Sequence, residues 1–242
     1  MSSLAQLCPT RGELREMMRL AWPVVLAQVG IMLMGVVDTA MVGRVSTSAV
    51  AAVALGHIYW VNVTIMGLGI LMVLDPVVSQ ATGARDHAGV SRGVQRGILM
   101  ALALSVPTAL LLIPGELFFG FLRQPPDVTP IAASFSRISI IGVVPFYLFF
   151  ALRQSLQAMA QTKPVVIAIV VSNFVNFALD YTLIYGHFGF PALGTNGSAI
   201  ATAISRWIMF ALLLYFGWKQ LHGAIVPWRA ESSNAGPLLK ML

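Results

Sequence analysis

Two aspartates lie inside otherwise apolar stretches of the sequence. Asp38 stands in the segment VVDT at 36–39, and Asp180 follows the segment NFAL at 176–179. An ionisable group inside a bilayer costs about 2.5 to 3.5 kcal/mol on insertion scales, so it is rare there without a partner or an ion pathway. Two such carboxyl groups therefore indicate transport of an ion or a solute.

The composition places the chain in a membrane. Of the 242 residues, 57% are hydrophobic and only 10% are charged, whereas soluble domains carry about 25% charged residues. A helix needs about 20 apolar residues to span a bilayer. We therefore predict an all-α membrane protein, a bundle of six transmembrane helices at about 20–43, 50–79, 94–113, 131–159, 164–185 and 198–218.

The basic residues predict the orientation of these helices, because Lys and Arg collect in short cytoplasmic loops. With the N-terminus inside, the outer side holds Arg44, Arg123 and Arg137. The inner side then holds ten basic residues: Arg11, Arg15, Arg19, Arg85, Arg92, Arg96, Lys163, Lys219, Arg229 and Lys240. We expect both termini in the cytoplasm. The net charge of +6 then faces anionic lipid, and no nucleic acid partner is expected.

The chain is expected to have three parts. Residues 1–19 form a cytoplasmic segment, residues 20–220 form the six-helix bundle, and residues 221–242 form a cytoplasmic linker toward a second bundle. The N-terminus lacks the pattern of a cleaved signal peptide, since basic residues precede a full-length apolar segment. The single cysteine, Cys8, cannot form a disulfide within the chain.

The two aspartates are predicted to share one level of the membrane. Asp38 lies six residues before Arg44 and Asp180 six before Gly186, which puts each roughly 9 Å below the outer end of its helix at 1.5 Å per residue. Asn173, Asn176 and Asp180 fall on one helical stripe. This seam should face protein or water. The structural alternative is that neighbouring hydroxyls or amides satisfy each acid and fix helix packing.

No set of residues indicates an enzyme, and no cofactor is expected. The histidines at 57, 87, 187 and 222 are scattered, and no zinc-protease, nucleophile-elbow or Walker sequence is present. A membrane enzyme that uses Asp75 and Asp180 is disfavoured, because their helices place them at opposite depths. We interpret Asp75 as structural, with Arg85 within reach.

Several segments resemble the multidrug and toxic compound extrusion (MATE) transporters, in particular the NorM type. The segment VDTAMVG at 37–43 is similar to the family's first-helix signature, and PVVSQATGA at 76–84 to its second-helix exit. The densest similarity runs from Asn176 through the loop at 185–194 to Ala203. The resemblance covers almost the whole chain. It implies only the N-terminal one of the family's two six-helix bundles, so the chain is expected to be truncated or split and to need the other bundle as a partner.

The resemblance also implies a site. In the family, a cavity of this bundle couples cations and binds substrate, and the matching residues here are Asp38, Asn176, Asp180 and Thr202. Na⁺ is a possible occupant at Asp38 and Asp180. Pro23 matches a first-helix proline linked to bending, and proline removes a backbone hydrogen bond within a helix. Secondary candidates are Asn173, Arg206 and Gln157.

Some residues depart from the NorM pattern. Asp180 resembles the DinF-type branch of the family, and Met34 stands where some relatives place a tyrosine. Arg206 lies one turn from Thr202 on the same face. It either pairs with Asp180 and holds that carboxyl group ionised, or it faces another helix or a wet cleft.

The expected function is secondary antiport in a bacterial inner membrane. A small organic, often cationic, compound would leave as H⁺ or Na⁺ enters and neutralises the carboxyl groups. One alternative is a lipid-linked oligosaccharide flippase, in which Arg153 and Arg206 would hold a phosphate-bearing substrate. Another is a membrane scaffold fragment without transport activity.

Overall fold

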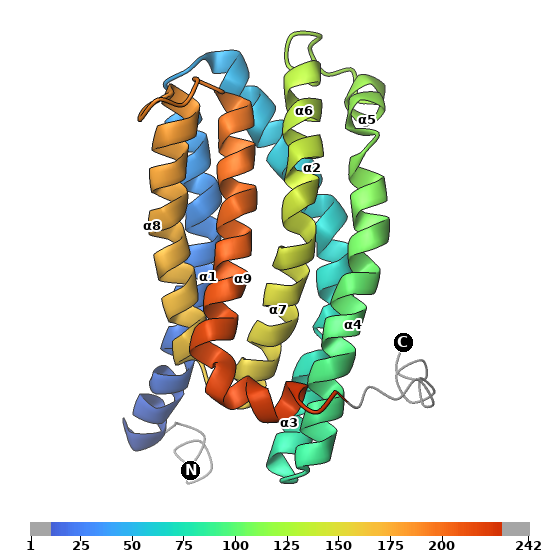
Figure 1. The fold of residues 1–242 in the computed structure, drawn as a ribbon, viewed down its shortest axis with the longest axis vertical. Coiled ribbons are helices and arrows are strands. Elements are labelled where there is room, and N and C mark those ends of the chain that lie inside the picture. Colours follow the sequence, from blue (N-terminus) through green and yellow to red (C-terminus); the bar gives the residue numbers. More distant parts are fainter. Residues whose placement is uncertain (1–10, 229–242) are drawn as a thin grey trace, which may run out of the picture.

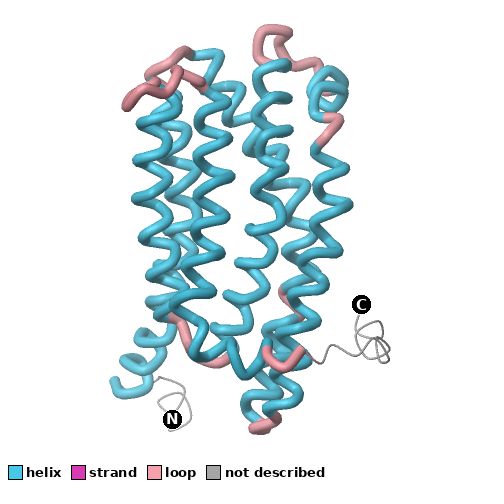
Figure 2. The backbone as a smooth tube through the Cα atoms, in the orientation of Figure 1, coloured by secondary structure: helices cyan, strands magenta, loops and turns pink. Residues whose placement is uncertain are grey.

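The computed structural model describes residues 11–228, and this part of the chain consists of helices and connecting loops without strands (Figure 1, Figure 2). The all-α prediction is therefore confirmed. Cys8, Arg229, Lys240 and most of the predicted linker at 221–242 lie outside the described residues.

Six helical segments are long and apolar enough to cross a membrane, in agreement with the six predicted spans. They cover Ala21–Val42, Thr47–Gly83, His87–Leu112, Thr129–Ala158, Lys163–Tyr185 and Thr195–Ile225. The single helices among them are α1 (Arg11–Val42), α4 (His87–Leu112), α8 (Lys163–Tyr185) and α9 (Thr195–Ile225). Helix α1 begins inside the segment 1–19 and α9 ends beyond residue 220, so the predicted boundaries of the bundle at 20 and 220 stay predictions.

The second span is broken into α2 (Thr47–Leu71) and α3 (Leu74–Gly83). Pro76 lies four residues after Met72 and has no N–H to donate to the Met72 carbonyl, and its ring crowds that carbonyl. The amide of Asp75 bonds the Met72 carbonyl instead, at 3.2 Å. The proline therefore accounts for a break that the prediction of one continuous span missed.

The fourth span is also interrupted, with α6 (Thr129–Ser139), a 3₁₀ turn η1 (Ile140–Gly142) and α7 (Val143–Ala158) in sequence. Pro145 cannot bond the carbonyl of Ile141, four residues earlier. The indole of Trp207 on α9 donates to that carbonyl at 3.2 Å. A short helix, α5 (Gly115–Phe121), precedes this span in a segment predicted as a loop.

The helices form two neighbouring groups. Helices α1, α8 and α9 pack together, and α2, α4, α6 and α7 pack together beside them (Figure 1). Pro23 lies inside α1, which continues through it. The role of Pro23 in bending stays a prediction.

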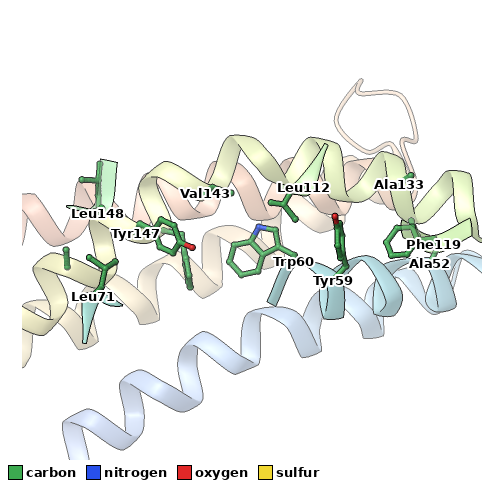
Figure 3. Packing of buried hydrophobic residues seen from close by; sticks show 14 of the residues in the cluster. Ala52, Tyr59, Trp60, Leu71, Leu112, Phe119, Ala133, Val143, Tyr147 and Leu148 are labelled. Carbon is green, nitrogen blue, oxygen red and sulfur yellow. The ribbon is translucent and has the colours of Figure 1, made fainter. Parts of the chain in front are cut away.

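A buried aromatic core fills the second group. Trp60, Tyr59, Phe119 and Tyr147 lie among its members (Figure 3). The Tyr147 hydroxyl donates to the Thr64 carbonyl at 3.0 Å and shares a hydrogen bond with the Thr108 hydroxyl at 2.9 Å. These two bonds fix the tyrosine between α2 and α4.

A buried amide ties the end of α9 to α4. The Gln95 side chain donates to the carbonyls of Ala224 at 3.1 Å and Pro227 at 3.0 Å, and the Ser91 hydroxyl donates to Ala224 at 2.7 Å. The start of α4 and the end of α9 therefore lie at the same end of the bundle.

Gly67→Ala should destabilise the fold, whereas Gly69→Ala should not. A Cβ at Gly67 would overlap the Tyr147 hydroxyl oxygen, while a Cβ at Gly69 meets nothing within 4 Å. Tyr147 cannot move without loss of its two hydrogen bonds, so we expect Gly67→Ala to lower the free energy of unfolding by about 1–3 kcal/mol. Unfolding in detergent measures both variants. Equal stability of the two would contradict the packing described.

Candidate functional site

Asp38 lies near the end of α1 and is almost fully buried, with 3% of its surface exposed. The Thr202 hydroxyl of α9 donates to its Oδ2 at 2.6 Å. This bond joins α1 to α9 through two residues that lie 164 positions apart in the sequence.

Asn176 and Asp180 of α8 are fully buried beside Asp38. Asp38 lies near enough to both side chains to interact with them electrostatically. Neither the Asn176 amide nor the Asp180 carboxyl group has a hydrogen-bond partner among the described residues. Two carboxyl groups in contact form a hydrogen bond only when one of them carries a proton. The three oxygen-bearing side chains, together with Thr202, thus offer a place for a proton or a small hard cation.

The polar stripe of α8 packs against α1. Asn173 donates to the Gly30 carbonyl of α1 and to the Ile169 carbonyl of its own helix, both at 2.9 Å. Asn176 and Asp180 continue along the same face toward Asp38. From the sequence we predicted that the two aspartates share one level of the membrane, and in the structure their side chains lie near enough to interact electrostatically.

A pocket of about 350 Å³ opens beside the carboxyl pair, between α1, α2, α7, α8 and α9. Its walls are mainly apolar. Asn176 and Asp180 are not in its lining and lie behind Asp38. The polar lining residues are Gln28, Asp38, His57, Thr64, Asn173, Thr202 and Arg206.

Arg206 of α9 lines this pocket and forms no salt bridge among the described residues, although Asp38 is near enough to interact with its charge. Its guanidinium lies over the Trp60 ring, 3.7 Å from the ring centroid, and 5.5 Å from that of Phe146. Nη1 is buried without an acceptor among the described residues. No ion pair joins it to Asp180 within residues 11–228, so that alternative is wrong and the cleft-facing one holds. Contact with the Trp60 ring face stabilises the cation instead.

The α2 side of the pocket was not among the candidates chosen from the sequence. His57, Trp60 and Thr64 all line the pocket, and Trp60 is buried. Their spacing of three and four residues puts them on one face of α2. This spacing is the signal that could have identified them together.

Two other predicted residues lie away from the pocket. Gln157 of α7 is not in its lining, and its Nε2 is buried without a partner among the described residues. Asp75 is exposed on α3 and forms no ion pair with Arg85 in the described part of the chain. Among residues 11–228 no three His, Cys, Asp or Glu side chains gather as a metal cluster.

Comparison with known proteins leads to the same family that the sequence motifs resemble. The family model MatE matches residues 23–182. The multidrug resistance protein MdtK of Yersinia pestis is 36% identical over 208 residues, which are 84% of this chain and 45% of MdtK. The multidrug resistance protein NorM of Vibrio vulnificus is 35% identical over 206 residues, 85% of this chain and 45% of NorM.

A solved structure of the same fold is described as MATE in the bent conformation. It superposes with a TM-score of 0.80 at 19% sequence identity. The superposed region covers 92% of this chain and 49% of the chain in that structure. The chain thus spans about half the length of the relatives it matches.

Thr202→Val should destabilise the protein more than Thr202→Ser. Valine has the shape of threonine but leaves the buried Asp38 Oδ2 without its donor, at a cost of about 1–3 kcal/mol. Thr182→Val is the matched control, because the Thr182 hydroxyl is exposed and bonds only its own helix. Unfolding in detergent compares the three variants. A Thr202→Val protein as stable as the Thr182→Val protein would rule out this bond as a stabilising contact.

Proposed function

The chain belongs to the MatE family of transporters, and we propose that it is a six-helix half of an antiporter that exports organic, often cationic, compounds in exchange for H⁺ or Na⁺. It is a multi-pass membrane protein. Family members are transporters rather than enzymes. The names of MdtK and NorM describe those proteins as multidrug resistance proteins, which supports the same role for this chain.

The closeness of the two buried carboxyl groups of Asp38 and Asp180 carries this proposal. Two ionised carboxylates in contact repel each other strongly where water is excluded. One proton shared between them, or one Na⁺ held by their oxygens with Asn176 and Thr202, removes that repulsion. The pair therefore favours the binding of one monovalent cation.

The pocket supplies a place where an organic cation competes for the same charge. Asp38 belongs to both the carboxyl pair and the pocket lining. Trp60 and Phe146 add aromatic surface, which binds flat or cationic groups. A proton or Na⁺ at Asp38 then disfavours binding of the organic cation. A bound organic cation likewise disfavours binding of the proton or Na⁺. Mutually exclusive binding is the basis of exchange.

Arg206 sets the charge balance of the site. With both aspartates ionised and Arg206 protonated, the group carries one net negative charge. One bound cation neutralises it. A second bound cation would leave a buried positive charge, which is costly in a membrane. This balance supports the exchange of one cation for another.

The second bundle is proposed to cover the open side of the pocket. Met32 of α1 and Ile65 of α2 line the pocket and are largely exposed, so it opens between α1 and α2. A bundle on this face would enclose the substrate. The proposed location is a bacterial inner membrane with both ends of the chain in the cytoplasm.

The flippase alternative has weaker support. It requires two positively charged side chains in the cleft, but among the described residues Arg206 is the only Lys or Arg that lines the pocket. Arg153 donates to Gln28 at 3.4 Å and is not in the lining. An acidic pair beside a single arginine suits a cation better than a phosphate. Translocation of a membrane-impermeant lipid would favour the flippase.

Asp38→Asn should remove pH-dependent binding of an organic cation to the purified chain. In the wild type, affinity should rise with pH, because loss of the shared proton frees the negative charge, and Na⁺ should lower it. Asparagine cannot ionise, so we expect at least about a tenfold lower affinity at high pH. Tryptophan fluorescence reports the binding, since Trp60 lines the pocket.

Asp75→Asn is the matched control, because Asp75 is exposed and outside the pocket. It should bind like the wild type. Efflux from everted vesicles that carry the chain with and without a complementary bundle extends the test to transport. Stable insertion without any H⁺-dependent or Na⁺-dependent binding would instead identify a scaffold.

A further inference from the structure

A second pocket lies far from the carboxyl pair, between α3 and α4. It has a volume of about 190 Å³. Leu74, Val77 and Ala81 of α3 form its apolar wall, and Arg92 and Arg96 of α4 form its charged side. None of its lining residues is acidic. It combines apolar surface with two guanidinium groups.

The pocket lies at the level where other helices of the bundle end. Gln95, between the two arginines, donates to Ala224 and Pro227 at the end of α9. Figure 1 shows α3 and the start of α4 at the end of the molecule where α9 finishes. A membrane places its phosphate groups at this level, just outside the ends of the apolar spans.

Few acidic groups of the protein neutralise the charges of the two arginines. Arg92 forms one exposed ion pair, with Asp86 at 3.4 Å, while Asp86 also caps α4 at the Gly89 amide. Arg96 is partly buried and has no hydrogen bond or ion pair within residues 11–228. An arginine near the end of a span normally extends toward phosphate groups.

The surface beyond Arg96 suits an acyl chain. Arg92, Arg96 and Leu99 follow one stripe of α4 at spacings of four and three residues. Leu99 is exposed. A headgroup held by the arginines would therefore continue into an apolar path along the helix, which a free phosphate ion would not use.

We propose that the pocket formed by Leu74, Val77, Ala81, Arg92 and Arg96 binds the phosphate group of an anionic phospholipid. Arg guanidinium groups bind phosphate oxygens through paired N–H donors. Basic pockets between helices at the cytoplasmic end of spans bind anionic headgroups. A bound lipid would link α3 to α4 at the break in the second span.

The test measures lipid binding to the purified 242-residue chain by native mass spectrometry from a neutral detergent. The probes are short-chain phosphatidylglycerol, phosphatidylcholine with the same acyl chains, and inorganic phosphate. We expect phosphatidylglycerol to bind at least about tenfold more tightly than phosphatidylcholine. Inorganic phosphate at equal concentration should not displace it. Displacement by phosphate, or equal binding of the two lipids, would overturn the assignment.

Two variants locate the site. R92Q/R96Q should lower the affinity for phosphatidylglycerol about tenfold. R44Q/R123Q removes the same charge from exposed arginines at the other end of the bundle and should bind like the wild type. Equal loss in both variants would show general charge attraction only, and no loss in R92Q/R96Q would refute the site.

Ala81→Phe tests the cavity without any change of charge. The larger side chain should occupy the pocket and lower the phosphatidylglycerol affinity, and unchanged binding would overturn the cavity assignment. Asp38→Asn should keep full lipid binding, because Asp38 lies outside this pocket. This result separates the lipid site from the proposed transport function.

Discussion

The hydrogen bond from Thr202 to Asp38, beside the buried side chains of Asn176 and Asp180, is the constraint on which the rest of the structure depends. These side chains come from α1, α8 and α9 and meet at a point where membrane burial makes unpaired charge costly. A hydroxyl donor and an amide can satisfy one ionised carboxylate but not two in contact. In the proposed function, a proton or a cation therefore stabilises the site, and an exchanger can use this dependence.

The surrounding helices hold this site by close packing rather than by further ion pairs. Asn173 links α8 to α1 through the Gly30 carbonyl, and Tyr147 links α7 to α2 and α4. Both groups of helices are thereby internally fixed. The pocket lies where they meet, lined from both sides, so a shift of α1 against α2 would change the pocket without unfolding either group.

Local sequence rules predicted the spans, the shared depth of the aspartates and the polar stripe of α8, because each depends on helical rise and period alone. Pro76 and Pro145 were visible in the sequence, but whether a proline bends a helix or breaks it depends on partners such as Trp207. The placement of Arg206 over Trp60 was beyond sequence reasoning, since it depends on how α9 packs against α2. The same holds for the pocket between α3 and α4, which follows from the break in the second span.

The most direct test of the exchange site counts the protons released when an organic cation binds to the purified chain in weakly buffered, Na⁺-free solution. We expect release of about one proton per bound cation near the pH at which the carboxyl pair shares its proton, and no release from Asp38→Asn. Saturating Na⁺ should suppress the release. Binding of the cation by the wild type without proton release and without competition by Na⁺ would contradict the proposed exchange site.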